Sequence, residues 1–226
     1  MNDLSWLLPM NLSHIVIPSD HPVFERVDQV LFDKVNHILV NYPDEELAQQ
    51  TYTIPEGTKS IGRGAFYGAV YLQTINFPED LETIGSEAFR NCENLTSIKL
   101  PDSIKEIGYN PFIGCINLRS IDISSELPVF EVRDNCLFNK EENRLIAYLI
   151  ASDAAVYTVP EGTKIIGHYS FYNSRLTEII LPDSLETIGS YAFGKSVDLM
   201  SINKPEGLAE VSKNAFYGCN IELTLP

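Results

Sequence analysis

Three observations on the sequence predict a β-rich, right-handed solenoid. The phrase "INFPEDLETIGSEAFRNC" (75–92) returns as "IKLPDSIKEIGYNPFIGC" (98–115) and as "IILPDSLETIGSYAFGKS" (179–196). Six of the eight gaps between successive strand-ending dipeptides are close to 23 residues, so the repeat has a fixed period. The two longer gaps, of 37 and 36 residues, contain a second repeated phrase that predicts two β-hairpin insertions. Because a unit of this size cannot bury its own apolar side, the copies must stack.

Each short unit begins with a strand. In "LTSIKLP" (95–101) the final Ile and Leu alternate with Lys99, which therefore faces solvent from a strand with one buried face. The proline that follows ends the strand because it has no N–H to donate. In "IKEIG" (104–108) two inward Ile residues predict a second short strand, and Gly108 is expected to allow a sharp turn. Stacking then gives a parallel sheet on one face, with the short second strands and 3₁₀ or irregular turns on the other.

An aromatic residue follows in every short unit, in phrases such as "EAF" and "NPF". These side chains are expected to form a ladder along the solenoid axis, each contributing roughly 2–3 kcal/mol by burial. The right-handed sense follows from the general preference of parallel crossovers. The residues in this position are Phe66, Phe89, Phe112, Phe171, Phe193 and Phe216.

The two long units repeat each other. "PVFERVDQVLFDKVNHILVNYP" (22–43) matches "PVFEVRDNCLFNKEENRLIAYL" (128–149), in which two apolar segments flank the polar turn "NKEEN". This is a hairpin pattern, in place of the usual "IGxxAF" loop. We expect a single solenoid over 1–226, with hairpin-bearing long coils at about 18–54 and 124–159 and regular repeats of about 23 residues at about 55–123 and 160–226.

The composition excludes several classes of protein. The chain has 226 residues, 44% of them hydrophobic, which suffices for an elongated array with a continuous core. Its 16 basic and 31 acidic residues give a formal charge of −15, which repels phosphate backbones, so no nucleic-acid partner is expected. The apolar run "LIAYLIA" (145–151) is too short to span a bilayer, so no membrane insertion is expected.

The two ends of the chain suggest a piece of a longer protein. The start, "MNDLSWLLPM", has neither the basic region nor the long apolar core of a secretion signal. The chain stops on the expected strand "IELTLP" (221–226) without the polar cap that closes a solenoid. The expectation is therefore either a fragment of a secreted protein or an intracellular protein.

Three of the four cysteines follow the repeat phrase, as "AFRNC", "PFIGC" and "AFYGC". Cysteines on equivalent rungs could lie close enough for a disulfide. Ala69 and Ser196 hold the same position in other copies, however, which favours a small, half-buried side chain and reduced, structural thiols. The four are Cys92, Cys115, Cys136 and Cys219.

The sequence contains no catalytic constellation, so we expect neither an enzyme nor a cofactor. The histidines, His14, His21, His37 and His168, have no metal-ligand spacing, and no HExxH or CxxC motif occurs. Carboxylates in the stacked "PED", "PDS" and "PEG" turns could attract a divalent cation, but a solvated edge is favoured. "NLS" (11–13) and "NLT" (94–96) match glycosylation sequons, although their place in the repeat favours structural asparagines.

The phrase "LxxIxIPxxxxxIGxxAFxxC" resembles the BspA-type leucine-rich repeats over nearly all residues from about 12 to 226. The resemblance implies a leucine-rich-repeat solenoid that is secreted or displayed at the cell surface of a bacterium. It also implies adhesion to extracellular-matrix proteins, other host proteins or other bacteria. A cytoplasmic scaffold and a structural spacer within a larger protein are the alternatives. A glycan-acting enzyme would require two carboxylates about 5–10 Å apart in a cleft.

The exposed positions of the parallel sheet are the predicted site for a protein partner. A flat sheet suits recognition over roughly 800 Å² per side, and we expect the chain to act as a monomer. The projecting hairpins are the second candidate. The predicted contact residues are Gln73, Asn76, Thr96, Lys99, Arg119, Asp122, Thr158, Glu178, Ile180, Met200 and Asn203.

Overall fold

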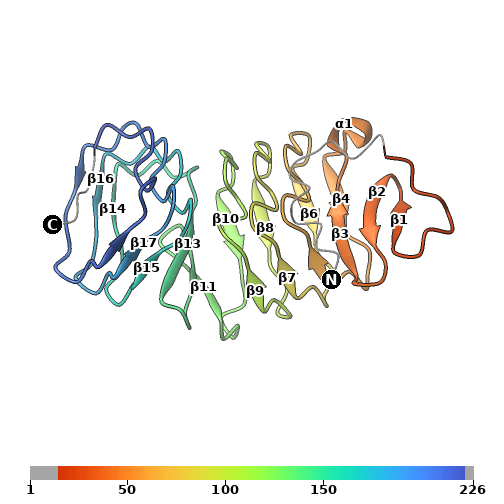
Figure 1. The fold of residues 1–226 in the computed structure, drawn as a ribbon, viewed down its shortest axis with the longest axis horizontal. Coiled ribbons are helices and arrows are strands. Elements are labelled where there is room, and N and C mark those ends of the chain that lie inside the picture. The colour runs from red at the N-terminus through yellow and green to blue at the C-terminus, as the bar shows by residue number, and fades with distance from the viewer. Residues whose placement is uncertain (1–14, 222–226) are drawn as a thin grey trace. The chain divides into compact units, whose positions relative to one another are not determined.

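A computed structural model describes residues 15–221, without the side chains of residues 45 and 46 (Figure 1). His14, the 11–13 sequon and nearly all of the expected strand at 221–226 lie outside the described residues. The chain divides into two compact units, residues 1–124 (unit 1) and 125–226 (unit 2). Each unit has its own strands and its own core. The single solenoid over the whole chain therefore remains a prediction.

Unit 1 begins with a three-stranded antiparallel meander, where the sequence pattern predicted one hairpin. The first turn is tight because Asp28 and Gln29 both adopt positive φ values, 47° and 70°, the conformation of a two-residue hairpin turn. The second turn is closed by Asp33, whose carboxylate accepts hydrogen bonds from the backbone N–H groups of Val35 and Asn36. The strands are β1 (Phe24–Val27), β2 (Val30–Asp33) and β3 (Ile38–Asn41), followed by the short helix α1 (Asp44–Leu47).

In the regular coils of unit 1 the short strands form one parallel ladder, and the long strands form two separate parallel pairs. In the long strands a buried side chain lies between two exposed ones, as the alternation predicted. The short strands continue the hairpin sheet, because β3 pairs in parallel with β5. The long strands are β4 (Thr51–Thr53), β6 (Thr74–Asn76), β8 (Ser97–Lys99) and β10 (Ser120–Asp122), and the short strands are β5 (Ser60–Ile61), β7 (Thr83–Ile84) and β9 (Glu106–Ile107).

Unit 2 repeats this plan. Its meander again ends in a strand that pairs in parallel with the first short strand. The meander strands are β11 (Phe130–Arg133), β12 (Cys136–Asn139) and β13 (Arg144–Tyr148). The long strands are β14 (Val156–Thr158), β16 (Glu178–Ile180) and β18 (Ser201–Ile202), and the short strands are β15 (Ile165–Ile166), β17 (Thr187–Ile188) and β19 (Glu210–Val211).

The hairpin does not replace the "IGxxAF" loop, contrary to the sequence prediction. In the first long coil, the last strand of the meander occupies the place of the short strand, since Leu39 pairs with Ile61. Tyr42 then occupies the place of the aromatic residue, and its ring stacks on Phe66 at 5.0 Å. Burial raises the pKa of Tyr42 to about 12. The long coil therefore contains a complete short coil with additional strands before it.

The predicted aromatic ladder is present within each unit. In unit 1 the rings of Phe66 and Phe89 are fully buried and stack at 5.1 Å, and Phe112 lies 5.8 Å beyond Phe89. In unit 2 the corresponding centroid distances are 5.4 Å from Phe171 to Phe193 and 5.0 Å from Phe193 to Phe216. Contact between the rings of neighbouring coils adds to the stability that burial provides.

The turns that carry these aromatic residues form a third ladder of backbone hydrogen bonds. Every second N–H points to the next coil: Phe66 donates to the carbonyl of Ala88 at 2.8 Å, and Gly64 donates to that of Ser86 at 3.1 Å. The residues between them close i→i+3 turns, and left-handed residues such as Glu87, with φ 58°, interrupt what would otherwise be a 3₁₀ run. Each coil therefore has three hydrogen-bonded sides.

Gly108 is required for a different reason from the predicted sharp turn. A Cβ atom built on Gly108 would lie 2.5 Å from the backbone nitrogen of Ser86 in the preceding coil. Gly85 meets Arg63 in the same way, at 2.6 Å. The glycine of the "IG" phrase thus allows neighbouring coils to approach closely, which a side chain would prevent.

Candidate functional site

The exposed residues of the long strands in unit 1, together with the exposed residue directly before each strand, are named here the long-strand face. All six predicted contact residues of unit 1 are exposed, in agreement with the strand alternation. Lys99 lies opposite Asp122 in the parallel register of β8 and β10. Asn76 lies opposite Thr53 and donates its side-chain N–H to the Thr53 hydroxyl at 3.0 Å. The six residues are Gln73, Asn76, Thr96, Lys99, Arg119 and Asp122.

The corresponding residues of unit 2 form a more apolar group. Met200 is 78% exposed and Ile180 is 40% exposed, whereas Glu178 is half-buried between them. Thr158 is exposed and lies opposite Ile180. The predicted residues are thus brought together as one group in each unit.

Asn203 has a structural role that the sequence pattern did not indicate. Its amide accepts a hydrogen bond from the backbone N–H of Leu181 at 2.6 Å and donates one to the Leu181 carbonyl at 2.8 Å. The side chain thereby imitates a peptide group and continues the ladder past β18. Both of its polar atoms are already used within the fold.

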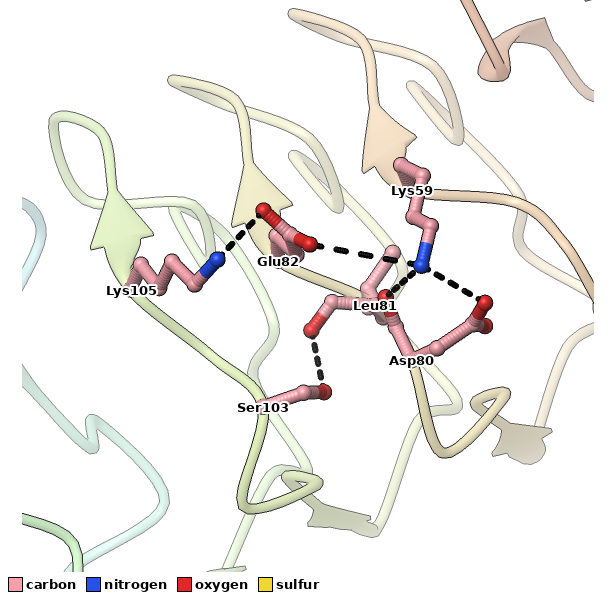
Figure 2. Close-up of polar contacts among 6 residues, drawn as sticks. All are labelled: Lys59, Asp80, Leu81, Glu82, Ser103 and Lys105. Atoms are coloured by element: carbon pink, nitrogen blue, oxygen red, sulfur yellow. Dashed lines mark hydrogen bonds and ion pairs between the residues drawn. The ribbon is translucent and has the colours of Figure 1, made fainter.

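The acidic turns in unit 1 are balanced by lysines, as Figure 2 shows. The Lys59 ammonium lies 2.8 Å from Asp80 and 4.0 Å from Glu82 of the next coil, and Lys105 of the following coil lies 2.8 Å from Glu82 (Figure 2). The hydrogen bond from Lys59 lowers the pKa of Asp80, and that from Lys105 lowers the pKa of Glu82. Ser103 donates a hydrogen bond to the carbonyl of Leu81 at 2.6 Å in the same region (Figure 2).

This arrangement makes a cation site at the acidic turns unnecessary. Asp80 of the "PED" turn and Glu82 directly after that turn already have lysine partners from neighbouring coils. Among residues 15–221, no group of His, Cys, Asp or Glu could hold a metal ion. Of the residues whose burial is described, only two carboxylates are buried, and Asp33 and Asp44 both accept backbone hydrogen bonds.

The cysteines of the repeat phrase are free thiols with a shared structural role. The Cys92 thiol donates to the carbonyl of Phe66 at 3.1 Å, and the Cys115 thiol to that of Phe89 at 3.0 Å. The Ser196 hydroxyl makes the equivalent bond to Phe171 at 2.8 Å. Burial raises the pKa of Cys92 well above its ordinary value, which keeps this thiol protonated.

The second sequon also has a structural explanation. The Asn94 side chain donates its N–H to the carbonyl of Val70 in the preceding coil at 2.7 Å. Asn117 and Asn220 make the same bond in other coils, at 2.9 and 2.8 Å. The prediction of structural asparagines is confirmed for Asn94.

A cluster of tyrosines in unit 2 was not predicted. Tyr169 and Tyr191 occupy the left-handed position of successive turns, and their rings stack at 5.1 Å with an interplanar angle of 7°. Tyr172 contacts Tyr169 at 5.6 Å, and Tyr217 contacts Tyr191 at 5.6 Å, both edge to face. The available signal was the tyrosine in "GHYSF" and "GSYAF", where unit 1 has Gly, Glu or Asn.

The coil architecture and the exposed polar strand positions define a leucine-rich-repeat solenoid. Residues 44–146 and 158–225 match the family described as the BspA type leucine rich repeat region, in six copies. The chain belongs to this family, as the resemblance in the sequence indicated.

Solved bacterial structures share this fold. The pneumococcal vaccine antigen PcpA is 32% identical, with a TM-score of 0.64, over 70% of this chain and 40% of PcpA. A leucine rich cell surface protein from Faecalibacterium prausnitzii is 29% identical, with a TM-score of 0.65, over 75% of this chain and 51% of that one. A leucine-rich repeat protein from Eubacterium ventriosum, 21% identical with a TM-score of 0.51, covers 92% of this chain and 53% of its own length.

The chain therefore spans only about half the length of these structures, or less. No curated protein matches it. In the part of the chain that the structure describes, no helix combines the length and the apolar character needed to cross a membrane.

Proposed function

We propose that the chain is a non-enzymatic, protein-binding module that acts at a bacterial cell surface, in adhesion to matrix or other host proteins. The observation that carries this proposal is the long-strand face of unit 1, where the six predicted contact residues are exposed in or just before the strands β6, β8 and β10. A row of exposed polar and charged side chains on a rigid sheet is suited to a protein partner because its geometry is already fixed.

Two further points support the proposal. One structural neighbour is described as a cell surface protein, and another as a vaccine antigen. The two buried carboxylates that could serve an enzyme, Asp33 and Asp44, are instead used to bind backbone N–H groups. A binding role therefore agrees better with the chemistry of the described residues than a glycan-acting role does.

The experiment is a binding assay of the purified chain on a panel of immobilised matrix proteins. Lys99→Glu and Arg119→Glu reverse the charge of two exposed residues of the long-strand face. For a matrix protein that binds the chain, each variant should bind about tenfold more weakly, the size of a typical interface hot spot. Lys34→Glu, which changes an exposed lysine of the first hairpin, is the charge-matched control and should bind like the wild type.

Two results would contradict the proposal. One is that no matrix protein binds the chain at all. The other is that Lys34→Glu weakens binding as much as Lys99→Glu does, because the effect would then depend on net charge rather than on a particular face.

A further inference from the structure

Three successive turns of unit 2 form a continuous edge. They follow β15, β17 and β19, which pair in parallel, and backbone hydrogen bonds join them: Tyr169 N–H donates to the Ser190 carbonyl at 3.1 Å, and Tyr191 N–H to the Asn214 carbonyl at 3.1 Å (Figure 1). The side chains of this tyrosine edge are Tyr169, Tyr172, Tyr191, Tyr217, Lys195 and Lys213.

The fold does not require tyrosine at this edge. Tyr169 and Tyr191 have φ values of 59° and 55°, in the left-handed region that a bulky side chain adopts unfavourably. The equivalent positions in unit 1 are Gly64 and Glu87, with φ values of 60° and 58°, so the turn forms with no side chain or with an acidic one. Two consecutive coils thus carry an aromatic ring that the conformation of the turn does not require, which points to a use for the ring.

The geometry of the rings limits what can bind there. Tyr169 and Tyr191 lie face to face, and the Lys195 ammonium lies 5.8 Å from the centre of the Tyr172 ring. The facing sides of Tyr169 and Tyr191 and one side of Tyr172 are therefore not open to stacking with a base or a sugar. The Tyr191 hydroxyl lies at the exposed surface, 3.4 Å from the Asn214 amide, and Tyr217 is 59% exposed. The tyrosine edge therefore exposes hydroxyl groups and the edges of aromatic rings to a partner.

The charge of the edge is opposite to that of the chain. The turns 168–175, 190–198 and 212–220 contain Arg175, Lys195 and Lys213 but a single carboxylate, Asp198, although the whole chain carries −15. None of the three basic side chains forms an ion pair with a described residue. In the matching turns of unit 1, by contrast, Glu87 forms ion pairs with both Arg63 and Arg90.

We propose that the tyrosine edge is a second docking surface, which binds an acidic peptide segment of a partner protein. The lysine ammonium groups form ion pairs with carboxylates of the segment. The hydroxyl groups and ring edges of the tyrosines contact its backbone and apolar side chains. Tyrosine is enriched at the energetic centres of protein interfaces, where it supplies contact area and hydrogen bonds with little loss of entropy. The acidic remainder of the chain disfavours a long polyanion, which would be repelled beyond the edge. This site is separate from the long-strand face.

The test uses variants that take the residue of the same position in another coil, so that folding is retained. Tyr191→Gly copies Gly64, Lys195→Asn copies Asn91, and Lys213→Ser copies Ser86. Lys34→Asn, which removes an exposed lysine of the first hairpin, is the matched control. A phage-displayed library of short random peptides is panned on the full wild-type chain, and the enriched peptides are synthesised and titrated against every variant.

The proposal expects the enriched peptides to be acidic and to bind each edge variant about tenfold more weakly than they bind the wild type or Lys34→Asn. Neutral or basic peptides, or equal binding to all variants, would overturn it. Heparin and a single-stranded DNA oligonucleotide are tested in parallel. Binding of either probe with the same dependence on Lys195 and Lys213 would assign the edge to a polyanion instead of a protein. A loss of binding in Lys34→Asn as large as that in the edge variants would also overturn the proposal, because the effect would then depend on net charge alone.

Discussion

The residues that follow the core phenylalanines show how a repeated fold reuses one contact. Cys92, Cys115 and Ser196 each donate a hydrogen bond to the carbonyl of the phenylalanine one coil earlier. A second recurrent hydrogen bond lies at the start of the turn. Ser86 accepts a hydrogen bond from the backbone N–H of Tyr109 at 2.9 Å, and in unit 2 His168 fills this role through its Nδ1 atom. The fold needs a small donor at one position and an acceptor at the other.

His168 should make the stability of unit 2 depend on pH. Burial, and then the Arg144 guanidinium, lowers the pKa of His168 below its ordinary value of 6.5, and the neutral ring accepts from the Ser190 N–H at 3.0 Å. Because the unfolded chain takes up this proton at a higher pH than the folded chain, stability is present above about pH 6.5 and is lost as the pH falls. In His168→Ser the serine replaces the acceptor without titrating.

Urea unfolding at about pH 7.5 and about pH 5.5 measures this contribution. The midpoint should fall less for His168→Ser than for the wild type over that interval, with similar values at the higher pH. An identical fall in both proteins would mean that His168 does not contribute.

At the scale of elements, ion pairs link neighbouring coils at the entry to the short strands. In unit 1 the sequence of charges is Lys59, Glu82, Lys105, so each carboxylate lies beside a lysine from a neighbouring coil (Figure 2). Unit 2 has a simpler version, in which Lys164 and Glu186 lie 2.9 Å apart and the next coil has Ala209 at this position. Alternation of charge along a parallel ladder favours the correct register, since a slipped pairing would place like charges together.

The pair in unit 2 allows a clean charge-swap experiment. Lys164→Glu and Glu186→Lys should each destabilise the protein by about 0.2–1 kcal/mol, because each places like charges side by side on an exposed surface. The double variant restores an opposite pair and should recover most of the lost stability. Thermal unfolding at low salt measures all three. If the double variant loses the sum of the two single effects, the two side chains do not interact.

At the scale of the molecule, the core of each unit is a column of aromatic rings that neighbouring coils share. The Phe89 ring contacts the Phe66 ring on one side and the Phe112 ring on the other, so its burial depends on both neighbouring coils. The free energy of unfolding of such an array is approximately the sum of a contribution from each coil and a contribution from each contact between neighbouring coils. A substitution that destabilises one coil should therefore lower the local stability of the neighbouring coils more than that of distant coils.

Phe89→Ala tests this expectation. Removal of a fully buried ring should lower the free energy of unfolding by about 3–5 kcal/mol. Hydrogen exchange should accelerate most in the short strands β7 and β9 and least in the most distant coils. A uniform acceleration along the whole chain would instead indicate one fully cooperative solenoid.

The sequence by itself determined the period, the buried and exposed positions of each strand and the column of phenylalanines, because these follow from apolar spacing within one coil. It therefore predicted the exposure of Lys99 and Arg119 correctly. Only the tertiary structure decided what depends on neighbours about 22–23 residues away: the stacked Tyr169 and Tyr191, the amide of Asn203 within the ladder and the lysine partners of the acidic turns. Such contacts form only when the coils stack, and the residue pattern within one coil does not indicate which side chains of the neighbouring coils it will contact.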